Sequence, residues 1–132
     1  MIVLDSSALV AIMRGEPEAE RFIEAIAVAK GLAFSAVSHL ETSMVLAGPK
    51  AKDAVWRPLE AFLKRANVEV VAFDREQART AREAFLRFGK GRHPASLNFG
   101  DCAAYALARA KKAPLLFKGG DFLKTDIAAA LS

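Results

Sequence analysis

Four acidic residues stand at points where the sequence pattern changes from a strand or turn to a helix. They are Asp5, Glu41, Asp101 and Asp121. Carboxylate oxygens are hard ligands that suit Mg²⁺ or Mn²⁺. If the fold brings the four acids together, they need a cation, because like charges at close range repel and raise each other's pKa values. A divalent ion held there lowers the pKa of a bound water and offsets negative charge on a phosphodiester.

The elements that must position these acids alternate along the chain. Apolar runs at residues 2–4, 32–34, 68–73 and 114–117 predict strands, with amphipathic helical segments between them. This alternation predicts an α/β fold, a three-layer sandwich around a parallel sheet of four or five strands with right-handed crossovers. Such a sheet gathers its strand-to-helix turns along one edge, where ligands bind. We therefore expect the four acids to face one pocket at that edge.

The ends of two helices leave alternatives open. Ser6 or Ser7 suits the N-cap of the first helix, and Asp5 itself would serve as a cap equally well. Pro58 lies inside the fourth helix, which the pattern begins at Lys50. A proline there either kinks the helix or marks a shorter start.

Size and composition describe one globular domain over residues 1–132, with 53% hydrophobic and 26% charged residues. The net charge of +4 and the pI of about 9.5 suit a polyanionic partner. No apolar run approaches the roughly 18 residues of a membrane span, and residues 1–20 lack a signal-peptide pattern, so we expect a cytoplasmic protein. Cys102 is the only cysteine, which excludes an internal disulfide, and we expect it to be buried.

The order and surroundings of the four acids resemble those of PIN-domain nucleases, in particular the VapC-like ribonuclease toxins of bacterial toxin-antitoxin pairs. The similarity spans essentially the whole chain. The segments that carry it are Asp5 after the leading strand, Ser38-His39-Leu40-Glu41, Asn98-Phe99-Gly100-Asp101-Cys102 and Phe117-Lys118-Gly119-Gly120-Asp121-Phe122. The resemblance implies Mg²⁺- or Mn²⁺-dependent cleavage of RNA, inhibition by a cognate VapB-like antitoxin, and a homodimer.

The four acids have different expected roles. Asp5 and Asp101 are expected to bind the metal directly, and Glu41 either binds it through water or orients the attacking water. Asp121 is the fourth member of the site. Asp126 remains an alternative to it, and a turn or cap role explains Asp126 equally well.

Substrate contacts are expected from Ser6, which would support the pocket, and from Arg92, His93 and Lys118, which would hold RNA phosphates. Solvated surface charge is the alternative for these basic residues. Asn98 would fix the loop that presents the third acid. For both Ser6 and Asn98, a purely structural role as a cap or turn residue is the alternative. Aromatic residues outside the expected core are few, so we expect recognition of RNA by shape and backbone more than by stacked bases.

A protein partner is expected at residues 38–66, a helical hairpin hinged at Gly48-Pro49. Its apolar surface is more than one hairpin side can bury. Trp56 and Leu46 are the residues we expect in a partner groove, since tryptophan is enriched at binding hot spots.

Two other functions compete with a nuclease. A receiver domain needs an acidic pair after the first strand, but Ser6 and Ser7 follow Asp5. A phosphatase with an aspartate nucleophile needs a second acid where Ser7 stands. A non-catalytic RNA-binding module is the remaining alternative; it has no reason to assemble four acids, and its RNA would stay intact in Mn²⁺.

Overall fold

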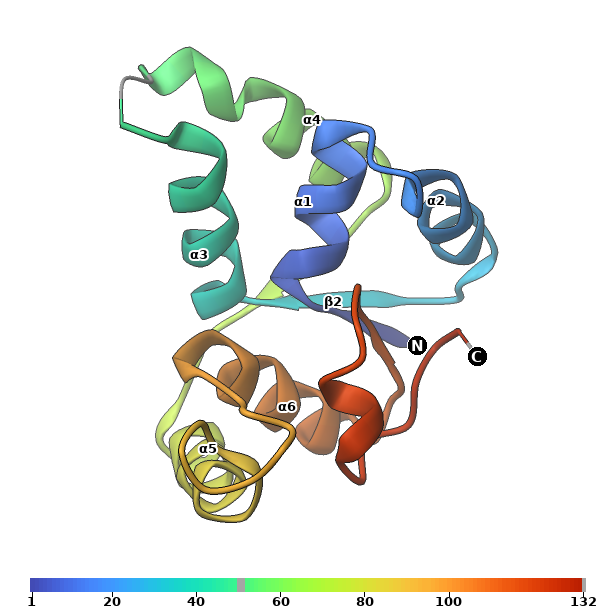
Figure 1. The fold of residues 1–132 in the computed structure, drawn as a ribbon. Helices are drawn as coiled ribbons and strands as arrows, with labels where there is room; N and C mark the ends of the chain where they lie inside the picture. The colour runs from blue at the N-terminus through green and yellow to red at the C-terminus, as the bar shows by residue number, and fades with distance from the viewer. Residues whose placement is uncertain (50–51, 132) are drawn as a thin grey trace.

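A four-stranded parallel sheet lies between two helical layers in the computed structural model, which describes residues 1–49 and 52–131 (Figure 1). The strands are β1 (Ile2–Leu4), β2 (Leu32–Ser35), β3 (Glu69–Val71) and β4 (Leu115–Leu116), in the order β3-β2-β1-β4. Every pairing is parallel. The predicted three-layer α/β sandwich is confirmed.

Successive side chains of a strand point to opposite faces of the sheet, so each face has its own core and its own covering layer of helices. Val3 points into one core and Leu4 into the other, and both are fully buried. The upper layer of Figure 1 consists of α1 (Ser6–Arg14), α2 (Ala19–Val28), α3 (Ala36–Ala47), the 3-10 helix η1 (Asp53–Trp56) and α4 (Arg57–Arg65). The lower layer consists of α5 (Arg75–Phe88) and α6 (Phe99–Lys111). Parallel strands need this cover on both faces, which explains why β1, β2 and β4 are mainly apolar and buried, while the edge strand β3 is largely exposed.

Two helix starts differ from the simplest sequence pattern. Asp5 is the N-cap of α1, so the expectation of a serine cap at Ser6 or Ser7 is wrong. Pro58 lies in the first turn of α4, where its missing N–H costs nothing, so it marks the shorter start rather than a kink. The expected start at Lys50 lies outside the described residues.

The strand order creates a switch point beside β1. The chain leaves β1 toward β2 on one side, and it returns from β3 to β4 on the other. The Asp5 N–H donates to the Leu116 carbonyl at 2.9 Å, so the end of β1 is tied to the end of β4. Crevices at such points bind ligands in open α/β sheets.

The chain after β4 forms the 3-10 helix η2 (Phe122–Lys124) and then returns along the sheet edge. The carbonyl of Ala128 and the N–H of Ala130 both bond to Leu115, at 2.9 and 2.8 Å, which makes a rudimentary fifth strand. Among the described helices, none is long and apolar enough to cross a membrane.

Candidate active site

Asp5 is the most deeply placed of the four acids, with 2% of its surface exposed. Its Oδ2 accepts hydrogen bonds from the Ser7 N–H at 3.1 Å and from the Ser7 hydroxyl at 2.5 Å. Its Oδ1 is buried and has no hydrogen-bond partner among the described residues. An unpartnered buried carboxylate oxygen is costly, so this atom indicates a place for a ligand.

The acids share one electrostatic site. The pKa of Asp5 is raised to about 7, chiefly by burial, with the negative charges of Asp101 and Glu41 adding to the rise and the Ser7 hydrogen bonds opposing it. Burial also raises the pKa of Asp101, with Glu41 and Asp121 adding to the effect. Each of the four sequence-predicted acids therefore lies within electrostatic reach of another member of the set.

Glu41 lies in the second turn of α3 and reaches across to α1 and α6. Its Oε1 accepts a hydrogen bond of 2.6 Å from the Ser6 hydroxyl. Gly100 faces the same carboxylate so closely that a Cβ at this position would overlap it. The sequence reasoning missed Gly100, although a glycine in the first turn of a helix costs about 1 kcal/mol relative to alanine and so signals a close approach.

Asp101 is held by the start of its own helix. The Asn98 side chain accepts from the Asp101 N–H at 2.9 Å, and Asp101 Oδ2 accepts from the Asn98 N–H at 3.0 Å. This reciprocal pair is a capping box. Of the two roles expected for Asn98, the structure shows the cap, and this cap positions the backbone of Asp101.

Asp121 and Asp126, the two candidates for the fourth acid, have different surroundings. Asp121 is exposed at the start of η2, and its charge raises the pKa of Asp101. Asp126 is engaged elsewhere: Tyr105 donates a 2.6 Å hydrogen bond to it, and the side chain of Arg109 pairs with it. Asp101 and Arg109 are eight positions apart in α6, or about 12 Å along the helix axis. Asp121 therefore lies within electrostatic reach of Asp101, whereas Asp126 is paired with Tyr105 and Arg109.

We call the side chains around Asp126 the Asp126 clasp, which consists of Tyr105, Arg109, Arg87 and Asp126. Arg87 joins it through a 3.3 Å ion pair. Partial burial raises the pKa of Asp126, but the hydrogen bond from Tyr105 and the charges of Arg109 and Arg87 outweigh it and hold this pKa below its ordinary value. The clasp ties the segment after β4 to α5 and α6.

Lys118 and Ser7 connect the acid pocket to the end of β4. The Lys118 N–H donates to the Ser7 hydroxyl at 2.9 Å, while the Lys118 ammonium pairs with Glu16 at 3.0 Å and with Glu18 at 3.6 Å. The side chain expected to bind phosphate is thus already paired with two acids. Ser7, which the sequence offered only as a helix cap, is the residue that holds Asp5.

The basic loop places its two predicted phosphate ligands differently. The ring of His93 accepts from the Ala95 N–H at 3.0 Å and packs edge-on against Phe88, so it has a structural use. Arg92 is exposed, with its guanidinium carbon 5.8 Å from the centre of the Phe85 ring. Arg92 is therefore the better placed of the two to meet solvent-borne phosphate.

A divalent metal fits the donors that are present. No three His, Cys, Asp or Glu side chains in the described part of the chain are already arranged as a metal cage. Mg²⁺ does not need one, since it binds one or two carboxylates and keeps several waters. The unpartnered Asp5 Oδ1, the hard oxygen donors and the mutual repulsion of the acids all suit such an ion.

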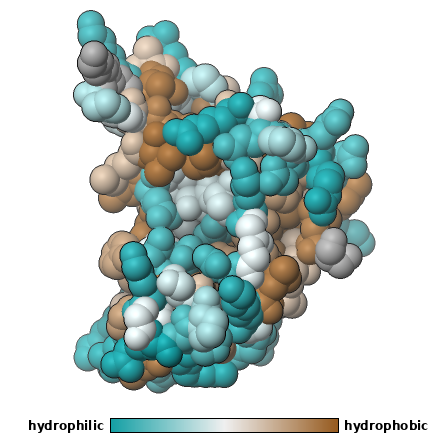
Figure 2. Space-filling view, viewed as in Figure 1, coloured by the Kyte–Doolittle hydropathy of each residue, from teal (hydrophilic) through white to brown (hydrophobic). Residues whose placement is uncertain are grey.

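The hairpin expectation needs a correction. Trp56 is half-buried, and its indole N–H donates to the Ser43 carbonyl at 2.7 Å, while Leu46 packs against the upper core. Apolar surface does lie over the region between α3 and α4 (Figure 2). The α3 side chains most open to solvent are instead Leu40, 59% exposed, and Met44, 65% exposed.

Comparisons with known proteins agree with this architecture. The model of the PIN domain family matches residues 2–128. The chain is 48% identical over 128 residues to the Ribonuclease VapC of Mycolicibacterium smegmatis, covering 97% of this chain and 98% of that protein. It is 46% identical over 127 residues to Ribonuclease VapC30 of Mycobacterium tuberculosis, covering 96% of each chain.

Solved structures show the same fold at low sequence identity. One is the VapC20 toxin of Mycobacterium tuberculosis, described as cleaving the sarcin-ricin loop, with a TM-score of 0.75, 20% identity and coverage of 97% of each chain. Another is VapBC2 of Rickettsia felis bound to a promoter DNA fragment, with a TM-score of 0.75, 21% identity and coverage of 98% of this chain and 96% of that one.

Proposed function

The chain belongs to the PIN-domain family and, within it, to the VapC proteins, and on this premise we propose that it is a metal-dependent endoribonuclease toxin. The observation that carries the proposal is the buried, unpartnered Oδ1 of Asp5 within a set of four mutually repelling acids. A protein that only binds RNA gains nothing from this arrangement, because the acids repel phosphate. Membership in this family also removes the receiver-domain alternative.

Asp5 and Asp101 are proposed to hold Mg²⁺ or Mn²⁺, with Asp121 completing the negative set. When bound, the ion lowers the pKa of a water and offsets charge on the phosphodiester. Ser7 keeps Asp5 Oδ2 occupied, and Oδ1 has no hydrogen-bond partner among the described residues, so it is the oxygen available to the ion. Ser6 does the same for Glu41 by donating to its Oε1.

Glu41 is then proposed to orient the attacking water and accept its proton at Oε2, the oxygen that Ser6 does not engage. Gly100 allows this carboxylate to approach α6. Water attacks the phosphorus in place of the ribose 2′-hydroxyl, so the expected products carry a 5′-phosphate and a 3′-hydroxyl.

RNA phosphates are proposed to meet Arg92, with His93 and Lys118 as weaker contributors because both already have partners. The net charge of +4 favours association with a polyanion. A toxin that cleaves cellular RNA would act in the cytoplasm.

A VapB-like antitoxin is the proposed protein partner. A hollow of about 370 Å³ lies along α3, lined by Val37, Leu40, Glu41, Met44, Val45 and Phe99. It is apolar except at Glu41, which belongs to the acid pocket, so an amphipathic helix seated there would bring a basic side chain within reach of the acids. A homodimer is proposed as well, and light scattering of the isolated protein tests it: a monomer would refute it.

The direct test is to incubate the purified protein with total RNA and Mg²⁺ or Mn²⁺ and to map the new 5′ ends. We expect discrete 5′-phosphate ends that are absent with a chelator and absent with Asp101→Asn. Intact RNA in Mn²⁺, together with measurable RNA binding, would support the non-catalytic RNA-binding module instead.

A further inference from the structure

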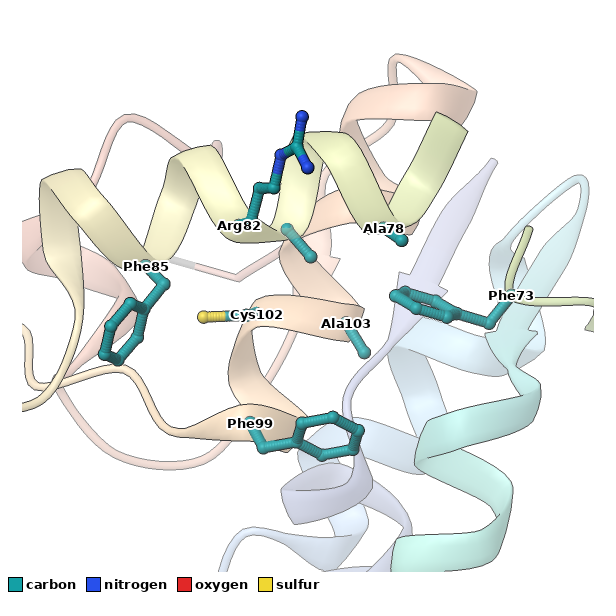
Figure 3. Close-up of a pocket in the computed structure, with 8 residues that line it drawn as sticks. Phe73, Ala78, Arg82, Phe85, Phe99, Cys102 and Ala103 are labelled. Carbon is teal, nitrogen blue, oxygen red and sulfur yellow. The ribbon is translucent and has the colours of Figure 1, made fainter. Parts of the chain in front are cut away.

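A second hollow, of about 350 Å³, lies between α5 and the start of α6 (Figure 3). Three aromatic rings surround it, those of Phe73, Phe85 and Phe99. Phe99 is 79% exposed and Phe85 is 41% exposed, so these two rings are open to solvent, while Phe73 is partly buried against the lower core. Phe85 and Phe99 are the largely exposed aromatic side chains in the described part of the chain, in keeping with the expectation that few lie outside the core.

The hollow adjoins the acid pocket. Phe99 begins α6, and Asp101 follows two positions later. Cys102 and Ala103, the next residues along the helix, line the hollow. Phe99 also lines the α3 hollow together with Glu41, so one exposed ring lies between the two cavities at the rim of the acids.

Positive charge borders the aromatic rings on two sides. Arg82 lines the hollow, and Arg75, Arg79 and Arg82 recur at helical spacing along one side of α5, all exposed. Within the described residues, none of these three forms an ion pair. On the other side, Arg92 lies against Phe85.

Aromatic rings interleaved with arginines are typical of a groove that binds single-stranded nucleic acid. A second copy of the chain fits less well. A two-fold contact on this face would bring the arginine row of one copy close to that of the other, and like charges across an interface are unfavourable.

We propose that this hollow is a base-binding subsite of the ribonuclease. An unpaired RNA base close to the scissile phosphate stacks on Phe99 and enters the space beside Phe73 and Phe85, while Arg82 and Arg92 contact the flanking phosphates. Stacking on phenylalanine tolerates any base, so the subsite selects an unpaired nucleotide rather than a sequence. The inference rests on the proposed ribonuclease function and adds where the substrate is held.

The test is a double-mutant cycle between the protein and its RNA. Short single-stranded RNAs that span a mapped cleavage site each carry one abasic nucleotide, and their affinities are measured with the divalent ion chelated. Phe99→Leu removes the aromatic face but keeps an apolar side chain. We expect it to weaken binding of the intact RNA about tenfold. With the unaltered protein, an abasic nucleotide at one position of the RNA should weaken binding by the same factor. With Phe99→Leu, that abasic RNA should bind no more weakly than the intact RNA.

Matched variants separate this effect from general damage. Val28→Ala changes a side chain that is 81% exposed on α2, in the other helical layer, and should leave RNA affinity unchanged. Arg82→Ala should reduce the salt dependence of binding by about one counterion. If Phe99→Leu fails to fold by thermal melting, Phe85→Leu replaces it in the cycle.

Two results would overturn the subsite. Losses from Phe99→Leu and from every abasic position that simply add would show that ring and base do not touch. A loss of RNA affinity that disappears when variants are compared at equal oligomeric state, measured by light scattering, would assign this face to a contact between copies. Failure of the unaltered protein to cleave RNA is a separate result, which would refute the proposed function itself.

Discussion

The acid pocket and the Asp126 clasp are both built around carboxylates, but the pKa values of these carboxylates shift in opposite directions. In the pocket, burial and neighbouring acids raise the pKa of Asp5 to about 7. In the clasp, Tyr105, Arg109 and Arg87 hold the pKa of Asp126 below its ordinary value despite partial burial. Both regions contact α6, the pocket at its first turn and the clasp near its last.

The two regions differ in whether the chain itself supplies hydrogen-bond donors and cations to the carboxylate. The chain itself provides a donor and two cations to Asp126, so that carboxylate already contributes to folding stability. The chain provides Asp5 with serine donors on one oxygen and nothing on the other. A buried carboxylate left unpaired in this way keeps a binding free energy available for a cation.

The largest effect is expected from removing charge in the pocket. Asp5→Asn or Asp101→Asn should lower RNA cleavage on the order of a thousandfold or more, because each replaces a charged metal ligand with a neutral side chain of similar shape. Mapped 5′ ends provide the measurement. Asp126→Asn is the matched control: it should cleave within about threefold of the unaltered protein and lose about 1 kcal/mol of stability, since its ion pairs are partly exposed. Equal losses in all three variants would erase the distinction between the two regions.

A smaller loss is expected from closing the space in front of Glu41. Gly100→Ala places a Cβ against that carboxylate and displaces it, which should lower cleavage about a hundredfold. Alanine is the better helix former, so folding should not suffer from backbone propensity. Gly120→Ala, where a Cβ meets open space, is the control, and only Gly100→Ala should show the loss when the 5′ ends are mapped. Full activity in Gly100→Ala would show that Glu41 needs no defined position.

The pH dependence of stability should distinguish the two regions next. Folded Asp5 holds its proton up to pH about 7, while its ordinary pKa is 3.8, so metal-free protein should lose stability as the pH rises between these values. Asp126 contributes in the opposite sense, because its stability is present above its ordinary pKa and is lost as the pH falls through the lower folded value.

Thermal melting in a chelator from about pH 2 to about pH 8 measures both trends, the Asp126 trend below pH 3.8 and the Asp5 trend above it. Asp5→Asn should remove the fall toward pH 8 and melt higher than the unaltered protein there, and added Mg²⁺ should restore the unaltered protein. If Asp5→Asn melts below the unaltered protein at pH 8 without metal, the charge of buried Asp5 does not destabilise the metal-free protein, and this prediction is wrong.

The smallest effect concerns two arginines that differ in the same way as the acids. Arg87 is paired with Asp126 in the clasp. Within the described residues, the Arg92 side chain forms no ion pair and lies against the Phe85 ring. Arg92→Ala should weaken RNA binding and reduce its salt slope by about one, with stability unchanged. Arg87→Ala should lower stability and leave the slope as it was. A salt titration followed by fluorescence anisotropy checks this, and identical slopes for Arg92→Ala and the unaltered protein would return Arg92 to solvated surface.

Much of this protein follows from its sequence because the signals are local. The apolar run ending at Asp5 predicted the first strand and its acid, and the alternation of strands and helices predicted a parallel sheet with one functional edge. Asn98 was expected beside the third acid as a loop-fixing, cap or turn residue, and it caps the helix that carries Asp101. Each of these predictions depends on residues that are close together in the chain, where the local backbone geometry determines which residues are in contact.

The tertiary structure decided whatever depends on partners distant in sequence. Asp121 and Asp126 look alike as turn acids, and only the packing of Arg87, Tyr105 and Arg109 against Asp126 separates them. Trp56 turned inward because Ser43 of the neighbouring helix offers it a carbonyl. Phe99 is left exposed and Glu41 meets Gly100 because of how α3 and α6 are placed across the sheet edge, a placement set by the packing of the two cores and by no pattern within either helix.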